Sequence, residues 1–273
     1  MRFSALVLTY NEELQIESCL RSLASADRVV LIDSGSSDRT LEIASSIARV
    51  EIQRRPFVSF ADQRNHGLEN TLERGTWVLH LDADERLTPQ LAGELNRLEP
   101  PEGAVAYNIA PRTYLRGRPV LRASGFPVYQ TRLSRAGFFR FEQVGHGQKA
   151  PDAFGILPRL RQPYDHHPFE KGYEAWRERH ERYAEAEARL LSDSADVSFT
   201  RALRDPILWR RWLNRVSARV PFRPGLVWFY LMFVRGGAWD GAAGWEYCRL
   251  RRTYERMVVG RLRSGTPGAR FPE

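Results

Sequence analysis

Cysteine, lysine and long apolar runs are all scarce in this sequence of 273 residues. Cys19 and Cys248 are the only cysteines, so we expect neither a disulfide framework nor a cysteine metal site, and we expect a reducing compartment. The longest apolar run, residues 226–234, has nine residues, about half of the roughly 20 needed to span a bilayer. The chain starts directly with a strand-like segment, and we therefore expect no signal peptide.

Positive charge is concentrated at one end of the chain. Only Lys149 and Lys171 are lysines, so arginine supplies nearly all of it. Residues 201–273 contain 15 arginines and five acids, a balance of +10, whereas residues 1–200 contain 26 basic and 28 acidic residues, a balance of −2. The net charge of +8 therefore originates in the last quarter of the sequence.

Short apolar segments alternate with amphipathic ones through the first hundred residues. Strands are predicted at residues 2–10, 27–37, 49–55 and 76–84, and helices follow each of them. Asn11 is a candidate N-cap of the first helix, and Thr88 followed by Pro89 opens the fourth. This alternation predicts a mostly parallel sheet with helices on both faces. In such sheets ligands bind at the carboxyl ends of the strands.

The pattern changes after residue 100. Residues 104–115 and 126–135 are predicted to form strands that could pair antiparallel, and the chain then becomes helical and arginine-rich. We expect an α/β domain over residues 1–150 and a helical, basic region over residues 151–273.

An acidic loop follows the fourth predicted strand. The sequence "LHLDADE" places Asp82, Asp84 and Glu85 within four residues. Hard divalent cations such as Mg²⁺ or Mn²⁺ take carboxylate oxygens and keep water or phosphate oxygens in their other positions. The alternative is that these acids only favour the N-terminal dipole of the next helix.

Three motifs occur in a characteristic order, "LTYNEE", "LIDSGSSDRT" and "QRNHGLENTLERGTWVLHLDADE". In this order and spacing the chain resembles the family 2 glycosyltransferases over about residues 3–98. The resemblance implies a GT-A fold, which is Rossmann-like, and inverting transfer of a sugar from a nucleotide-sugar donor.

The resemblance also implies roles for residues at the first strand ends. Thr9, Asn11 and Glu12 match the first nucleotide-contacting loop. Asp33 matches the acid that hydrogen-bonds the base, usually uracil, although it could simply form the turn at its strand end. Arg64 matches an arginine that could hold a phosphate, although it could also lie on a solvated helix face.

The acidic loop matches the D-x-D motif of the family. Asp82 would lie near the ribose and the metal, and Asp84 would bind the metal. The cation, Mg²⁺ or Mn²⁺, would offset the charge that grows on the departing nucleoside diphosphate. A general base must also remove a proton from the acceptor hydroxyl.

The base segment departs from the family pattern. Many relatives carry His-Glu or Glu-Asp there, but this chain has "FRFEQVGHGQ". Glu142 and His146 are the candidates, and Gly147 stands where a His-Glu form would have its acid. Glu142 could instead be a surface acid, and His146 a ligand contact or a packed loop residue. The downstream cluster "YDHHPFEKG" could bind a metal, but capping and packing are the favoured interpretation.

The basic region mixes arginine with most of the chain's tryptophans between residues 201 and 263. Such a segment could lie in a membrane interface and be attracted by anionic lipid, or it could pack on the catalytic domain with a solvated basic face. Nucleic-acid binding is disfavoured because no recognition motif is present. Residues 235–247 resemble a glycine-rich segment of bacterial relatives that build lipopolysaccharide core or exopolysaccharide. We therefore expect a saccharide or lipid-linked acceptor and a peripheral position at the cytoplasmic membrane face.

Two other functions compete with sugar transfer. A sugar nucleotidyltransferase usually has a glycine-rich phosphate loop after its first strand, and "LTYNEELQ" has no glycine. A non-catalytic sugar-nucleotide-binding protein could have inherited the same fold.

Overall fold

The computed structural model describes residues 1–144, 147–193, 220 and 222–264. The chain forms two compact units. The first comprises residues 1–121 and 125–171, and the second comprises residues 122–124 together with the chain from Gly172 onward. The domain boundary predicted at residue 150 falls inside the first unit, and the first α-helix after that position begins at Gly172.

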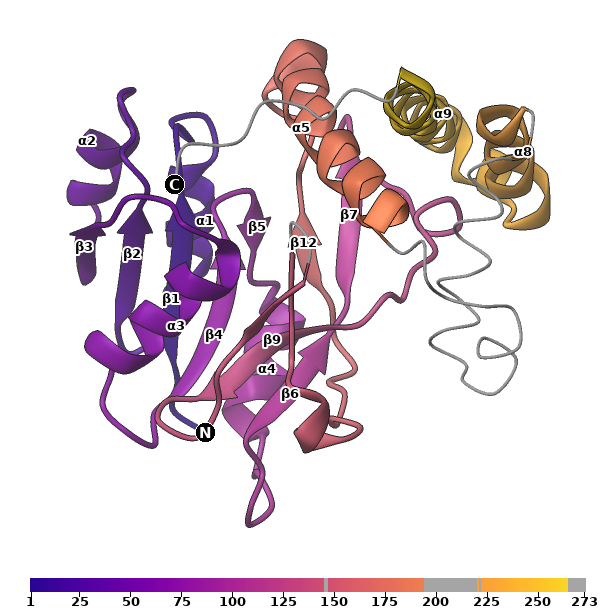
Figure 1. Cartoon of the computed structure of the whole chain (residues 1–273). Coiled ribbons are helices and arrows are strands. Elements are labelled where there is room, and N and C mark those ends of the chain that lie inside the picture. The colour runs from indigo at the N-terminus through magenta and orange to yellow at the C-terminus, as the bar shows by residue number, and fades with distance from the viewer. Residues whose placement is uncertain (145–146, 194–219, 221, 265–273) are drawn as a thin grey trace. The chain divides into compact units, whose positions relative to one another are not determined.

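A six-stranded sheet forms the centre of the first unit (Figure 1), in the order β3-β2-β1-β4-β9-β6. Its strands are β1 Ser4–Thr9, β2 Val29–Asp33, β3 Val50–Arg54, β4 Trp77–Asp82, β6 Ala106–Ile109 and β9 Gln130–Arg135. The first four strands run parallel, and β9 is antiparallel to both β4 and β6. The predicted mostly parallel sheet with later antiparallel pairing is therefore confirmed.

Both faces of this sheet are covered by helices. They are α1 Ile16–Ser22, α2 Thr40–Ser45, α3 Phe60–Asn70 and α4 Pro89–Arg97. Ala5 and Val7 of β1 join one apolar core with α1, α2 and α4, whereas Leu6 and Leu8 join a second core with α3. Because successive strand residues point to opposite faces, a strand buried on both sides must be apolar throughout, as β1 nearly is.

Of the two N-caps predicted from the sequence, one is observed and the other is not. The Thr88 hydroxyl accepts a hydrogen bond from the Leu91 N–H, with Pro89 in the first turn, so the predicted cap of α4 is confirmed. The cap predicted at Asn11 is wrong, because α1 begins at Ile16. Asn11 instead has a φ of 51° and lies in a turn. Short polar side chains tolerate this left-handed conformation better than bulky ones.

A smaller sheet and a hairpin complete the first unit. The smaller sheet has the order β5-β12-β7-β8, and the hairpin pairs β10 with β11. Their strands are β5 Glu85–Arg86, β7 Pro111–Leu115, β8 Arg118–Pro119, β10 Glu142–Val144, β11 Gly147–Lys149 and β12 Tyr164–His166, and a 3₁₀ turn, η1, spans Asp152–Phe154. Strand β12 returns the chain to the acidic loop, since it pairs with β5.

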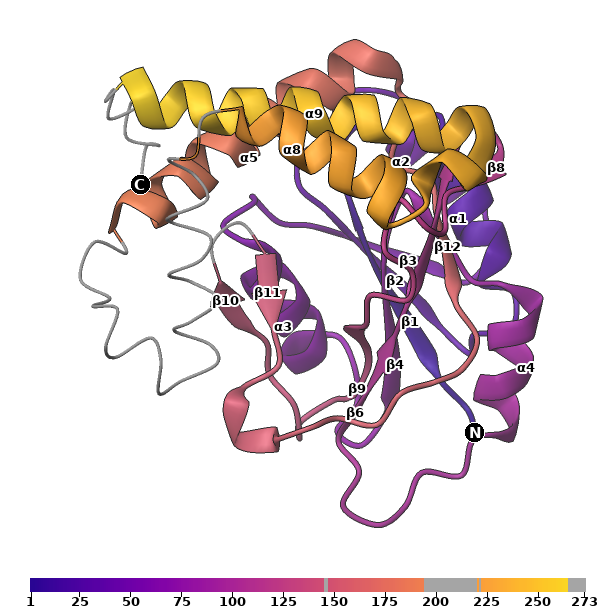
Figure 2. The same ribbon diagram turned by 90° about the vertical axis from the view of Figure 1, so that its right-hand side faces the viewer.

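The described part of the second unit is helical. It contains α5 Gly172–Asp193, α8 Arg223–Phe229, the π-helical turn η3 Tyr230–Val234, the 3₁₀ turn η4 Gly237–Asp240 and α9 Gly241–Ser264. Helix α8 runs beside α9 (Figure 2), and α9 also packs on α5. Among the described residues, no helix is both long and apolar enough to cross a bilayer. The predicted C-terminal helical region is confirmed.

Candidate functional site

Three polar strand ends are neighbours in the central sheet. Thr9 at the end of β1 is in register with Asp33 at the end of β2, and Leu8 of β1 is in register with Asp82 at the end of β4. These ends lie at the carboxyl edge of parallel strands, where α/β sheets bind ligands. The convergence expected from the sequence is therefore present.

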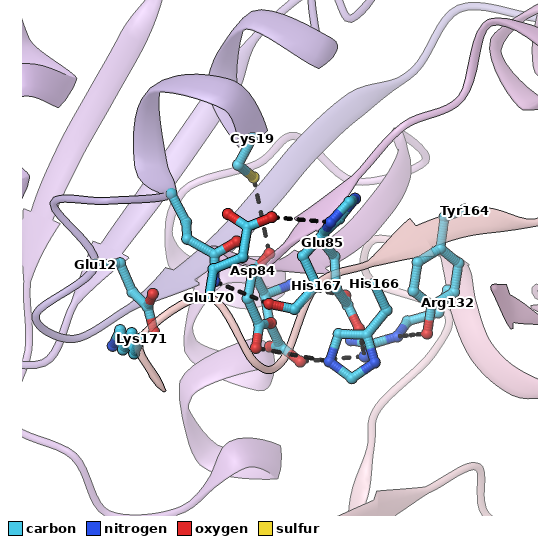
Figure 3. Close-up of polar contacts among 12 residues, drawn as sticks. Glu12, Cys19, Asp84, Glu85, Arg132, Tyr164, His166, His167, Glu170 and Lys171 are labelled. Atoms are coloured by element: carbon cyan, nitrogen blue, oxygen red, sulfur yellow. Dashed lines mark hydrogen bonds and ion pairs between the residues drawn. The ribbon is translucent and has the colours of Figure 1, made fainter. Parts of the chain in front are cut away.

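The turn after β1 is held by hydrogen bonds to the turn after β2. The Asn11 side-chain carbonyl accepts from the Ser37 N–H at 2.8 Å, and the Glu12 N–H donates to the Thr40 hydroxyl at 2.7 Å. Glu12 also pairs with the Lys171 ammonium at 2.6 Å (Figure 3). Asn11 and Glu12, two of the three predicted nucleotide-contacting residues, are thus held by contacts within the chain.

Asp33 closes the turn at its own strand end. Its buried carboxylate accepts hydrogen bonds from the Gly35 and Ser36 N–H groups, each at 3.0 Å. Gly35 has a φ of 98°, a conformation that favours glycine. The turn-forming role left open by the sequence is therefore real, and contact with a base stays a prediction. Nearby, the buried Thr9 hydroxyl has no hydrogen-bond partner among the described residues.

Two arginines bind the first acid of the acidic loop. Arg64 of α3 donates to Asp82 Oδ1 at 2.7 Å, and Arg132 of β9 donates to Asp82 Oδ2 at 3.1 Å. Both arginine side chains are buried, so Arg64 does not lie on a solvated helix face. Burial lowers the pKa of Arg64 to about 10, although Asp82 opposes this, and the residue stays charged near neutral pH. Burial alone would raise the pKa of Asp82, but the two guanidinium groups hold it below its ordinary value.

Arg132 also organises the residues around Asp82. It donates to Glu85 Oε1 at 2.5 Å and to the Tyr164 hydroxyl at 3.1 Å. Glu85 in turn accepts from the Asp82 N–H at 2.8 Å, which fixes the backbone of the acidic loop. Burial raises the pKa of Glu85 to about 7, although Arg132 opposes the shift. Arg64, Arg132 and Glu85 therefore form a buried ion-pair network around the partly exposed Asp82, next to Asp84 in the loop.

Strand β12 brings two histidines to this loop (Figure 3). His166 Nε2 lies 3.6 Å from Asp84 Oδ2, and the His167 N–H donates to the Asp84 carbonyl at 2.8 Å. The His167 ring stacks on Tyr114 at a centroid distance of 4.8 Å. Burial would lower the pKa of His166, but the carboxylates of Asp84 and Glu85 raise it above its ordinary value. The histidine cluster does pack, as expected, but it packs against the acidic loop.

The donor set around Asp84 fits a hard divalent cation. Asp84 offers a carboxylate, and His166 could add an imidazole nitrogen only in its neutral form, whereas both oxygens of Asp82 already accept from arginine. Within the described ranges, no group of three or more His, Cys, Asp or Glu side chains has a geometry that could hold a metal ion. Such a cation would therefore depend on ligand and water oxygens for its remaining positions, which is common for Mg²⁺.

Among the described residues, no hydrogen bond or ion pair joins a candidate base to the acidic loop. Glu142 of β10 is half-exposed and lies 3.6 Å from the Lys149 ammonium. Its described hydrogen bonds and ion pairs include none to the acidic loop. His146 lies outside the described residues. Both assignments stay predictions.

Sequence analysis missed several residues of the network. Arg132 lies in a predicted strand that carried no motif, whereas Tyr164 and His166 lie in the cluster "YDHHPFEKG", which was assigned to capping and packing. An arginine in a buried strand was the available signal for Arg132, since an arginine that is fully buried needs a charged partner.

The sequence matches known proteins over the first unit. Residues 4–156 match the family described as "Glycosyl transferase family 2". An uncharacterized glycosyltransferase of Rickettsia bellii is 34% identical over 96 residues, which cover 34% of this chain and 31% of that protein. A lipopolysaccharide core biosynthesis glycosyltransferase of Rhizobium meliloti is 31% identical over 160 residues, 57% of each chain. The matched segments thus span about a third to somewhat over half of these relatives.

A solved structure that covers nearly the whole chain has low sequence identity and a low TM-score. Residues 1–349 of TarS from S. aureus have a TM-score of 0.46 and 18% identity, with 98% of this chain and 93% of that chain covered. The family assignment therefore depends on the sequence match, which spans more than half of the chain. On that match, the chain belongs to glycosyl transferase family 2.

Proposed function

We propose that this protein transfers a sugar, with inversion, from a UDP-linked donor to a saccharide or lipid-linked acceptor in the synthesis of cell-envelope polysaccharide or lipopolysaccharide. Sugar transfer is the activity of the family to which the chain belongs. The observation that supports this reaction best is the pairing of Asp84 with His166 beside three adjoining polar strand ends.

Donor binding would use the strand ends. Asp33 and the turn after β1 would contact the nucleoside, and the unpartnered Thr9 hydroxyl is a donor and acceptor at the same edge. Arg64 uses Nη2 on Asp82, and its Nε and Nη1 have no acceptor among the described residues. Both atoms are buried and the side chain is only 1% exposed, so a phosphate contact from Arg64 would require this side chain to become accessible when the donor binds.

Asp84 would hold the divalent cation, Mg²⁺ or Mn²⁺, with Asp82 beside it, and His166 could add a nitrogen ligand only after losing its proton, because the neighbouring carboxylates raise its pKa. Bound there, the cation would supply positive charge to the leaving diphosphate. The chain's own contribution is to orient Asp84, because Arg64, Arg132 and Glu85 hold the Asp82 side chain and the backbone of the acidic loop next to it. In this proposal Asp82 orients the loop and approaches the ribose, and it adds less to cation binding than Asp84.

The acceptor hydroxyl would lose its proton to Glu142 or His146. If Glu142 is the base, Glu142→Gln should lower kcat by about 10²–10⁴-fold with little change in donor affinity. If His146 is the base, His146→Ala should do so instead. Steady-state kinetics with binding measured separately by calorimetry distinguishes these cases, and retained turnover in both variants would rule out this segment as the source of the base.

The acceptor class is inferred from similarity. The match to the lipopolysaccharide core glycosyltransferase of Rhizobium meliloti supports an envelope saccharide as acceptor. Such acceptors are presented at a membrane, which agrees with the expected peripheral position at the cytoplasmic face.

The donor is best found by thermal shift against a panel of nucleotide sugars, with and without Mn²⁺. A ligand that binds only the folded state raises its stability. We expect one UDP-sugar to raise Tm more in the presence of Mn²⁺, and Asp84→Ala to lose that increment while remaining folded. Stabilisation without turnover on any saccharide acceptor would instead identify a non-catalytic binding protein. Normal turnover by folded Asp84→Ala protein would refute the metal role.

A further inference from the structure

One side of the segment from residue 222 to 234 exposes large apolar side chains. At intervals of three or four residues, the exposed positions are Phe222, Leu226, Phe229, Tyr230, Phe233 and Val234, which we call the apolar stripe. Each is at least 47% exposed, and Phe222 reaches 84%. Residues at this spacing share one side of a helix, so the stripe is continuous.

The other side of the same segment is packed. Met232 is fully buried, and the helix contacts α9 along its length. The stripe is therefore left over after the second unit has formed its own core. Large contiguous apolar patches on a protein surface commonly mark an interaction site.

Aromatic rings extend the stripe onto the neighbouring helix. Phe229 and Phe233 have ring centroids 5.0 Å apart, Trp228 lies 5.9 Å from Phe233, and Trp245 of α9 lies 6.0 Å from Trp228. Trp245 is half-exposed and Trp239 is 81% exposed. Phenylalanine, tyrosine and tryptophan together are the side chains that favour the boundary between water and acyl chains.

The exposed charge of residues 222–264 has one sign. The exposed charged side chains of this range are all arginines, namely Arg235, Arg249, Arg256, Arg261 and Arg263. Arg235, which directly follows the stripe, is exposed. A second copy of this chain would bring the same positive charge to the interface and be repelled, whereas an anionic lipid surface would be attracted.

The length of the segment decides how it could meet a bilayer. Residues 223–234 amount to 12 residues, or about 18 Å at 1.5 Å per residue, against roughly 30 Å for the hydrocarbon core. The segment is too short to cross, and it is apolar on one side only. Such a helix lies in the plane of the interface with its apolar side inward.

We infer that the apolar stripe is a docking surface for an anionic membrane, with its aromatic side chains inserted at the headgroup boundary and the exposed arginines of the same unit, such as Arg235, near the lipid phosphates. This partner is independent of the proposed sugar transfer, because neither donor nor acceptor takes part in the contact. No helix in the described part of the chain can span a membrane. Docking through the stripe would instead hold the protein at the surface that carries lipid-linked saccharides.

The test is co-sedimentation of the full chain with vesicles of phosphatidylcholine containing 30% phosphatidylglycerol, compared with pure phosphatidylcholine. Phe229→Ser/Phe233→Ser removes two rings of the stripe. Ile156→Ser is the matched control, because Ile156 is 96% exposed but belongs to the first unit. Circular dichroism and Tm would be measured to check that both variants remain folded. We expect them to be folded, since the replaced side chains are already half or more exposed.

Wild-type protein and Ile156→Ser should bind the anionic vesicles, bind neutral vesicles less, and bind more weakly as salt rises. Phe229→Ser/Phe233→Ser should reduce the partition coefficient by about tenfold or more. Equal binding by wild type and this variant would overturn the inference, and so would a wild type that ignores anionic vesicles at low salt. A concentration-dependent dimer in solution that this variant abolishes would also overturn it, since the stripe would then be covered by a second copy.

Discussion

The acidic-loop network of the first unit and helix α9 of the second unit use arginine in opposite ways. In the first unit Arg64 and Arg132 are buried at the end of the central sheet, and each donates to a carboxylate. In the second unit most described arginines of α9, such as Arg249 and Arg256, are exposed and lie on the surface. The same side chain therefore fixes the geometry of a loop in one unit and supplies surface potential in the other.

The difference follows from the cost of removing charge from water. A buried guanidinium is tolerated only where carboxylates and hydroxyls satisfy it, so its position is strongly specified. An exposed guanidinium has no such requirement and gains little from any single partner. Buried arginines therefore mark a site whose geometry is fixed, and exposed ones mark a surface whose net charge matters.

The largest effect on stability is expected from Arg132→Met. This change leaves Glu85 buried without its cation, and we expect the free energy of unfolding to fall by about 3–5 kcal/mol. Urea denaturation measures the loss. If the variant does not fold, Arg132→Lys, which keeps the charge but not the fork of donors, should give a smaller, measurable loss. A loss below about 1 kcal/mol for Arg132→Met would show that the network is not energetically coupled.

The next effect concerns cation binding. Asp84→Asn should weaken Mn²⁺ binding in the presence of UDP by about 100-fold or more, because it removes a direct ligand. Asp82→Asn should weaken it by about tenfold, since Asp82 is engaged with Arg64 and Arg132 and acts through the loop. Electron paramagnetic resonance of free Mn²⁺ measures both, and a larger loss for Asp82→Asn would reverse the assignment.

A nearly buried arginine in the second unit tests whether burial alone, or position in the acidic-loop network, makes an arginine important for stability. Arg223 is only 11% exposed and lies 2.9 Å from the buried Glu255, which also pairs with Arg251. Because Arg251 remains as a partner, Arg223→Met should cost about 1–3 kcal/mol, less than Arg132→Met. If both variants lost the same free energy of unfolding, the acidic-loop network would contribute no more to stability than the ion pair of Arg223 with Glu255.

The smallest effect is expected at an exposed arginine. Arg249→Met should change the free energy of unfolding by no more than about 0.5 kcal/mol, since the side chain lies on the exposed face of α9. The same variant should still bind anionic vesicles, slightly more weakly. A loss of several kcal/mol in the urea experiment would show that the basic face of α9 is packed and not free.

Sequence periodicity predicted the centre of the sheet well because β1, β2 and β4 are almost uniformly apolar. The register that joins Thr9 to Asp33 and Leu8 to Asp82 follows from parallel pairing of those strands. Local patterns therefore located the three strand ends and the acidic loop. The family match then supported the fold that these patterns indicated.

Long-range contacts could not be predicted in the same way. Arg132 meets Glu85 across 47 residues of chain, through an antiparallel strand whose position depends on the whole sheet. His166 reaches Asp84 only because β12 pairs with β5. No local spacing records such pairings, so the partners of the acidic loop became visible only in three dimensions.

The most direct test of the account is the stereochemistry of the product. The UDP-α-sugar that stabilises the protein most with Mn²⁺ would be incubated with a saccharide acceptor, and the anomeric configuration of the new bond read by NMR. Inverting transfer at the acidic loop predicts a β-linked product that wild-type protein forms and Asp84→Asn forms at least about 100-fold more slowly. An α-linked product, or equal rates for wild type and Asp84→Asn, would contradict it.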